Sequence, residues 1–135
     1  MSQPLLNFAH LCDLAFLSRE GKLNIIGIFE HISAHQFPAR HAKISLVMNV
    51  YLEKGEYPLL IRIVQERDNR EVAKISGSVS CQKTGNVGII NEFQNISFPE
   101  PGEYAAEIWI NNEPAGEKGK ISFSLLSSSD KEPKL

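Results

Sequence analysis

Histidines are the residues of this 135-residue chain whose chemistry first suggests a site. An apolar run up to residues 20–21 and another after them predict a hairpin in which the numbers of facing residues sum to about 41. His10 then lies opposite His31, with Cβ atoms ~5 Å apart. Two imidazoles at that separation can chelate zinc, with His35 or Glu30 as a third ligand. A three-residue loop at the turn would shift this register.

The alternative for these histidines is a structural role. Two half-exposed imidazoles at the end of a sheet can bond to water or to backbone groups, and the chain has neither a CxxC nor an HExxH spacing. We therefore predict no bound metal and no cofactor. His10, His31 and His35 stay as the candidate ligands.

The two cysteines, Cys12 and Cys81, are the candidate nucleophiles. A catalytic thiolate needs a base beside it and a group that orients the base. Both cysteines fall at positions expected to face inward, where a thiol behaves as a small apolar side chain. Two cysteines are also too few for a disulfide framework, so we predict reduced thiols, no enzymatic activity and a cytoplasmic location.

The stretch from Asn95 to Leu126 contains the clearest elements that could position such residues. It predicts a strand, a Pro-Gly corner around Gly102, a long strand, an Asn-Asn turn at residues 111–112 and a closing strand. Tyr104 should enter the long strand with its ring inward and its hydroxyl on a backbone group, an arrangement similar to the tyrosine corner of sandwich domains. The residues expected inward along this strand are Tyr104, Ala106, Ile108 and Ile110.

The rest of the chain repeats this two-residue period. Residues 43–52 should point Ile44, Leu46, Met48, Val50 and Leu52 inward. Residues 59–65 and 71–81 should form a hairpin whose pair sum is near 138, which places Arg67 opposite Glu71. Seven to eight strands without a confident helix predict an all-β protein, a single antiparallel β-sandwich over residues 1–126. Residues 127–135 lack apolar periodicity and are expected to form a disordered tail.

Composition argues against several classes of partner. The chain carries 14 basic and 16 acidic side chains, interspersed, for a net charge of −2, so we expect no nucleic acid. The apolar N-terminus lacks basic residues and is interrupted by His10 and Asp13, so we expect neither a signal peptide nor a membrane span. The three aspartates are widely separated, which disfavours a calcium-dependent membrane-docking sandwich.

Two blocks of sequence resemble a known family. GKLNIIGIFEHI, followed by Phe37-Pro38, and FPEPGEYAAEIWINNEPAG resemble the motifs of a family of small bacterial proteins of unknown function. The resemblance implies an immunoglobulin-like sandwich and no assigned activity. This chain has Asn111-Asn112 where Asp-Gly is commoner in the family, but asparagine tolerates the positive φ of such a turn.

Two aromatic residues are candidates for a binding surface. Alternation places Tyr51 and Trp109 on the faces opposite the main inward set, where large aromatics can anchor a partner protein. The alternative is that a loop or a terminal segment covers them. We therefore predict a non-enzymatic module that binds another protein or itself, as in a homodimer, through a sheet face or edge. The second hypothesis is a metal- or small-molecule-binding protein, or an enzyme, with its site at His10 and His31.

Overall fold

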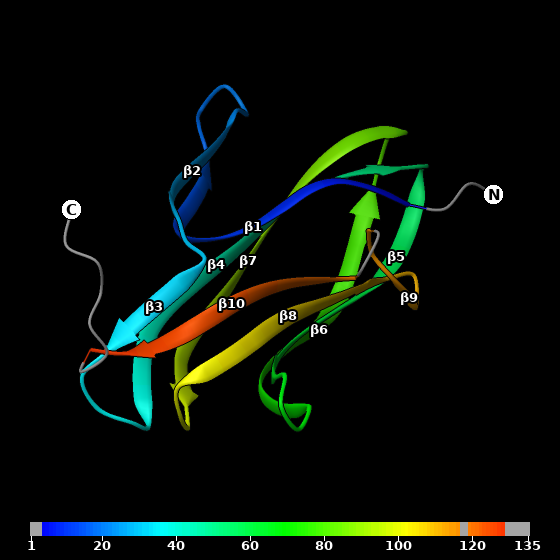
Figure 1. The fold of residues 1–135 in the computed structure, drawn as a ribbon. Coiled ribbons are helices and arrows are strands. Elements are labelled where there is room, and N and C mark those ends of the chain that lie inside the picture. Colours follow the sequence, from blue (N-terminus) through cyan, green and yellow to red (C-terminus); the bar gives the residue numbers. More distant parts are fainter. Residues whose placement is uncertain (1–3, 117–118, 129–135) are drawn as a thin grey trace.

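A computed structural model describes residues 4–116 and 119–128. Two β-sheets lie face to face around one core, and the described residues form no helix (Figure 1). The sheet called sheet A here has the order β2-β1-β4-β7, and sheet B has the order β3-β10-β8-β5-β6, with β9 paired to β8. The strands are β1 (Leu5–Leu17), β2 (Leu23–Ile28), β3 (His31–Ala34), β4 (Ala39–Leu52), β5 (Gly55–Gln65), β6 (Arg70–Cys81), β7 (Gly85–Phe98), β8 (Gly102–Ile110), β9 (Glu113–Pro114) and β10 (Lys120–Ser127).

The all-β prediction is confirmed, but the architecture differs in three ways from the expected sandwich. The described residues form ten strands rather than seven to eight, because two of them are short and the run 23–32 is divided. One pair, β3 with β10, is parallel. One sheet curls like half of a barrel, which departs from the expected immunoglobulin-like arrangement.

The division of the run 23–32 sets the topology. β2 pairs with β1 in sheet A, the chain then crosses at Phe29 and Glu30, and β3 pairs with β10 in sheet B. The last strand is therefore held between an early strand and β8. Ser127 pairs with Ala34, so the expected tail begins in ordered structure, and its residues 129–135 lie outside the described residues.

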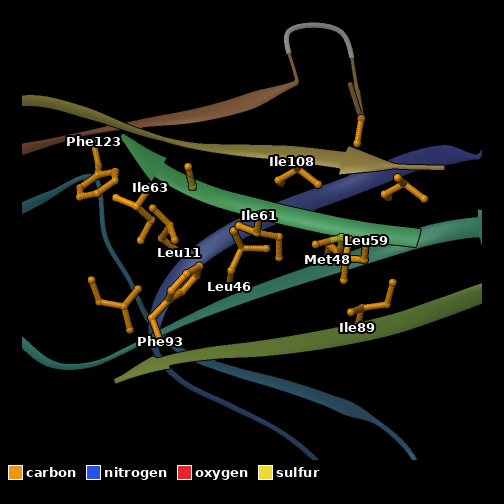
Figure 2. Packing of buried hydrophobic residues seen from close by; sticks show 14 of the residues in the cluster. Leu11, Leu46, Met48, Leu59, Ile61, Ile63, Ile89, Phe93, Ile108 and Phe123 are labelled. Atoms are coloured by element: carbon orange, nitrogen blue, oxygen red, sulfur yellow. The ribbon is translucent and has the colours of Figure 1, made fainter. Parts of the chain in front are cut away.

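The core lies between the two sheets, and period-two alternation predicted it well. The inward sets expected on β4 and β8 are all buried, as are Leu59, Ile61 and Ile63 on β5 (Figure 2). Two aromatic residues, Phe98 and Phe123, pack with Tyr104 and with each other at ring-centroid distances of 5.1 to 6.0 Å. This cluster anchors the ends of β7 and β10 to β8.

The β5–β6 hairpin keeps the expected faces but not the expected partners. Ile63 lies opposite Ala73, so the pair sum is 136 rather than 138, and the even number keeps apolar residues on one face. A bulge after Ile63 and a turn with Asn69 at φ 58° account for the slip. The expected pairing of Arg67 with Glu71 is therefore wrong, and Glu71 binds Arg62 instead, with 2.8 Å between Nε and Oε1.

The tyrosine corner is confirmed. The Tyr104 hydroxyl donates a hydrogen bond to the Glu100 carbonyl oxygen at 2.6 Å, and Gly102 has φ 139°, a value that favours glycine. The Asn-Asn turn also forms as expected, with Asn111 at φ 56° and Asn112 at φ 66°.

Replacing Tyr104 with phenylalanine should lower the free energy of unfolding by about 1 kcal/mol. The ring would keep its contacts with Phe98 and Phe123, while the Glu100 carbonyl oxygen, in a partly buried position, would lose its hydroxyl donor. Urea denaturation of the wild type and the variant measures the difference. Equal midpoints and slopes would show that the hydroxyl does not stabilise the corner.

Candidate functional site

The histidines do not form the expected pair. The β1–β2 pair sum is 40 rather than 41, because the loop between Ser18 and Lys22 has three residues, with Gly21 at φ 83°. His10 pairs with Val47 of β4, whereas His31 begins β3 in the other sheet. The prediction that His10 and His31 face each other is wrong, so the two rings do not lie opposite each other as the proposed zinc site requires.

The remaining histidine contacts are structural. The His10 ring stacks on Phe8, with 5.6 Å between the ring centroids. His35 Nδ1 lies 2.7 Å from the Ser128 hydroxyl oxygen, beside the end of β10. Within residues 4–116 and 119–128, no three His, Cys, Asp or Glu side chains gather closely enough to hold a metal ion.

Both cysteines are free and buried, as expected. The Cys12 thiol lies 3.5 Å from the Leu14 carbonyl oxygen, and Cys81 belongs to the core cluster. Cys12 differs from expectation in one respect: it pairs with Ser45, on the face of sheet A that points away from the core. Burial raises the pKa of the Cys12 thiol, which opposes thiolate formation and fits a packing role.

Because of the Cys12 thiol, the free energy of unfolding should fall as the pH becomes alkaline. The raised pKa in the folded state means that the unfolded chain loses this proton first. The contribution is therefore fully present below the unfolded value of ~8.5 and is lost as pH rises above it, by up to about 1.4 kcal/mol per pH unit. Urea denaturation of Cys12→Ala between about pH 8 and 9.5 should give a flatter profile than the wild type. Parallel profiles would contradict this effect.

The most unusual surface is the outward face of sheet A. Leu11 and Leu46 pair with each other and point into the core, so their neighbours on β1 and β4 point outward. Six large apolar side chains are exposed at outward positions of β1, β2 and β4. We call these six side chains the outer apolar face. They are Leu5 (61% exposed), Leu14 (37%), Phe16 (41%), Ile26 (51%), Ile28 (55%) and Tyr51 (40%).

The strand register places these six side chains in two groups on one face. Ile28 lies beside Cys12, Ile26 beside Leu14, and Leu5 beside Tyr51. Between the two groups lie the partly buried Phe8 and His10, the fully buried Val47, and Asn49, whose Oδ1 accepts a hydrogen bond from Asn7. The outward positions of β1 and β2 carry no Asp, Glu, Lys or Arg from Phe8 to Phe16 and from Asn24 to Ile28.

Part of this face lies on a projecting hairpin. β4 pairs with β1 only as far as Cys12, so the β1–β2 hairpin beyond that point extends away from the other strands (Figure 1). Leu17, on the hairpin's opposite side, is 56% exposed. Sequence reasoning found Tyr51 and did not single out Leu14 or Phe16 as surface residues. The missed signal was that positions of both parities are apolar in residues 14–17 and 23–28, which a strand with one buried face does not need.

Trp109, the other aromatic candidate, lies on the outward face of sheet B. The Arg62 guanidinium sits 6.0 Å from the centre of its ring, and Glu71 and Glu107 hold that guanidinium. A shallow hollow of about 390 Å³ adjoins the ring, lined by Pro58, Leu59, Leu60, Lys74, Ser76, Gly77 and Asn112. Trp109 is half-buried by these contacts, so it presents less apolar surface than the outer apolar face.

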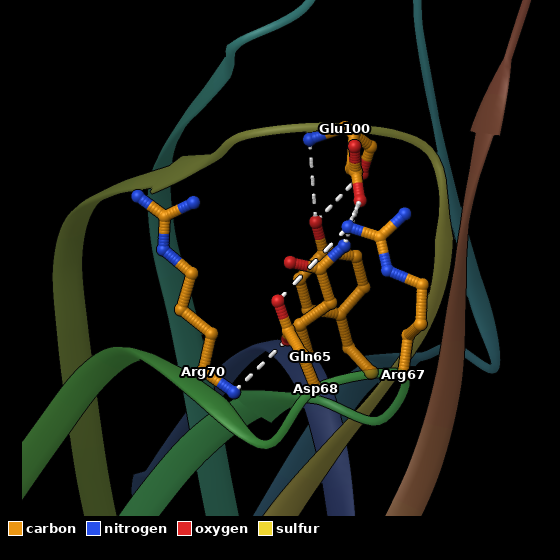
Figure 3. A network of polar contacts seen from close by, with 6 residues as sticks. Gln65, Arg67, Asp68, Arg70 and Glu100 are labelled. Carbon is orange, nitrogen blue, oxygen red and sulfur yellow. Dashed lines mark hydrogen bonds and ion pairs between the residues drawn. The ribbon is translucent and has the colours of Figure 1, made fainter.

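A polar network at the tyrosine corner is the third candidate (Figure 3). Gln65 is buried and donates from Nε2 to Glu100 Oε1 at 2.5 Å, while its own Oε1 has no hydrogen-bond partner among the described residues. Arg67 forms ion pairs with Glu100 and Asp68. The Tyr104 hydroxyl bonds to the backbone of Glu100, so the network ties the β5–β6 turn to the corner. The polar groups of this network bind one another, so the network stabilises the corner and is not a candidate binding site.

Comparison with known proteins gives a family and a fold. A family model described as "Family of unknown function (DUF6941)" matches residues 7–119. The chain belongs to this family. No curated protein matches it. The match confirms the expectation of a family of unknown function, and it adds no activity.

A solved structure similar to this fold is described as Pseudomonas fluorescens alkylpurine DNA glycosylase AlkC bound to DNA containing an abasic site analog. The TM-score is 0.51 and the sequence identity 12%. The match covers 87% of this chain and 30% of the glycosylase chain. At this identity the likeness concerns the fold alone.

In the described part of the chain, no helix is long and apolar enough to cross a membrane.

Proposed function

We propose that this protein is a non-enzymatic protein-binding module, and that the outer apolar face of sheet A is its binding surface. The observation that carries the proposal is the concentration of six exposed large apolar side chains on the outward face of sheet A. Nucleic acid and membranes are not among the proposed partners, because the chain has a net charge of −2 with interspersed charges.

The size of this face supports a binding role. A fully exposed side chain of this size presents ~150–200 Å², so six side chains exposed by about a third to three-fifths together present on the order of 500 Å². The largest apolar patch on a typical soluble monomer is ~300–600 Å² and is often functional, so this face is of the size expected for an interaction site. At ~25 cal/mol per Å², leaving this area in water forgoes on the order of 12 kcal/mol of gross burial free energy.

Capture experiments with charged variants test the proposal. Immobilised wild-type protein should retain specific partners, with its own chain counted among them, and Ile28→Lys should lose them because lysine cannot be buried there unpaired. Ser78→Lys places the same charge at an exposed position of β6 in sheet B and is the matched control. Quantitative mass spectrometry of the retained proteins is the readout. Equal retention by Ile28→Lys and the control would reject this face as the binding surface.

A cytoplasmic location belongs to the same proposal. Cys12 and Cys81 are both free and buried in the fold, and neither contributes to a disulfide. Proteins with unpaired structural thiols are typical of reducing compartments. Fractionation of cells that express the full chain tests the location.

A further inference from the structure

We infer that the occupant of the outer apolar face is a second copy of this chain, packed face to face around a two-fold axis. This inference rests on the proposed function and names its partner. Leu14, Phe16, Ile26 and Ile28 of each copy would form the centre of the contact, and Leu5 and Tyr51 would extend it along β1 and β4. The β1–β2 hairpin of each copy would lie over sheet A of the other.

The projecting hairpin is the first argument for a permanent partner. Isolated two-stranded hairpins are at best marginally stable in water, and stability needs a third strand or an apolar face packed on something. Beyond Cys12, β1 has only β2 as a neighbour, and the side chains on both surfaces of the hairpin are partly or largely exposed. A partner present whenever the chain is folded meets this need, whereas a transient partner leaves the hairpin exposed between encounters.

The chemistry of the face is the second argument. Interfaces between partners that also exist separately are about as polar as ordinary protein surface, whereas permanent and homodimeric interfaces are more apolar. The outward positions from Phe8 to Phe16 and from Asn24 to Ile28 contain no acidic or basic residue apart from His10. A face of this kind suits a permanent contact, and symmetric pairs of one chain are the commonest permanent assemblies.

The area is the third argument. A stable pair of proteins buries ~800 Å² on each side, of which roughly two-thirds is apolar in homodimers. The six side chains present on the order of 500 Å², which is about the apolar area that one side of such a homodimer interface buries. The polar remainder lies at the rim, where ion pairs carry both signs of charge: Lys22 with Glu20 at the hairpin tip, and Lys43 with Glu92 at the far side of sheet A.

This rim also fits a two-fold arrangement. Both ion pairs lie outside the outward positions from Phe8 to Phe16 and from Asn24 to Ile28 that form the apolar centre, so a two-fold contact leaves that centre free of charge.

Sedimentation velocity of the full chain tests the inference, over a roughly hundredfold range of concentration in the micromolar region. The wild type should sediment as a dimer. Ile26→Lys and Ile26→Glu, each at a position that is 51% exposed, should each weaken dimerisation at least ~100-fold, because every dimer then carries two like charges in its apolar centre. An equimolar mixture of the two variants should regain dimers, because the opposite charges pair across the axis.

Ser78→Lys is again the matched control and should remain a dimer. A wild type that stays monomeric throughout overturns the inference. If Ile28→Lys in that case still abolishes capture of a different protein, the proposed binding function stands and only its partner changes. A dimer that both Ile26 variants leave intact also overturns the inference, because the contact then lies elsewhere. Failure of the mixture to regain dimers, after both variants have lost them, overturns the two-fold, face-to-face arrangement.

Discussion

Phe123→Ala is expected to destabilise the fold by about 3–5 kcal/mol, the largest effect that we predict for a single substitution in this chain. Phe123 is 2% exposed and packs against Phe98 at 6.0 Å, against Tyr104 at 5.9 Å and against Phe29 at 6.3 Å between ring centroids. Removing its ring leaves a cavity where β7, β8 and β10 and the β2–β3 crossing meet. Urea denaturation with global fitting of the midpoint and slope is the measurement.

Ser122→Ala is the matched control, because Ser122 is exposed and one residue away on the opposite face of β10. A loss close to zero for Ser122→Ala and of about 3 kcal/mol or more for Phe123→Ala is expected. A loss below about 1 kcal/mol for Phe123→Ala would mean that the aromatic cluster is not the centre of this end of the core.

Gly27→Val is expected to destabilise the β1–β2 hairpin by about 2–4 kcal/mol. Gly27 has φ 73°, which a β-branched side chain rarely adopts, and an added Cβ would lie 2.3 Å from Asp13 Oδ2 and 3.1 Å from Asp13 Cβ. The backbone strain and the clash act together on a hairpin that projects from the other strands. Hydrogen exchange of residues 13–28 should therefore speed up more than that of the core strands.

Two further variants separate the causes. Gly77→Val lies in β6 at a position without a positive φ, and an added Cβ meets nothing within 4 Å, so it should leave exchange of the hairpin unchanged. Gly27→Val combined with Asp13→Gly removes the clash and keeps the strained φ, so it should recover only part of the loss. Full recovery would show that the backbone conformation at Gly27 contributes nothing.

Side-chain alternation predicted most of the core because the apolar positions within one strand indicate which of its faces is buried. The inward sets of β4, β5 and β8 needed no knowledge of strand partners, and all are buried. The tyrosine corner was equally local, since Pro99, Pro101 and Gly102 constrain the backbone beside Tyr104.

Registers were less predictable because they depend on loop geometry that differs by a single residue. A three-residue loop rather than a two-residue turn between Ser18 and Lys22 moved every pair in the first hairpin and removed the opposition of His10 and His31. The bulge after Ile63 moved the second hairpin in the same manner. Both errors arose where one glycine or asparagine with positive φ decides the geometry of a loop.

The candidate site was predicted only in part. Tyr51 was expected on an outward face, and it lies there, 40% exposed. Leu14 and Phe16 were not singled out as surface residues, because a run of large apolar residues usually indicates burial within the same chain. A surface that needs a partner carries the same composition as a core, and a single sequence does not distinguish the two.

The parallel pairing of β3 with β10 has a consequence for the order in which the chain can complete its fold. β10 follows the other described strands in the sequence, yet it lies between β3, whose last residue is Ala34, and β8. Until Lys120–Ser127 has left the ribosome, β3 has no strand to pair with and the positions of Phe123 and Leu125 in the core stay empty. Sheet B therefore closes only after synthesis of this region ends, with nearly ninety residues separating the paired strands, a separation typical of slow closure. During that interval the nascent chain exposes the edges of β3 and β8 together with the outer apolar face, which makes translation the stage at which this protein most needs protection from aggregation.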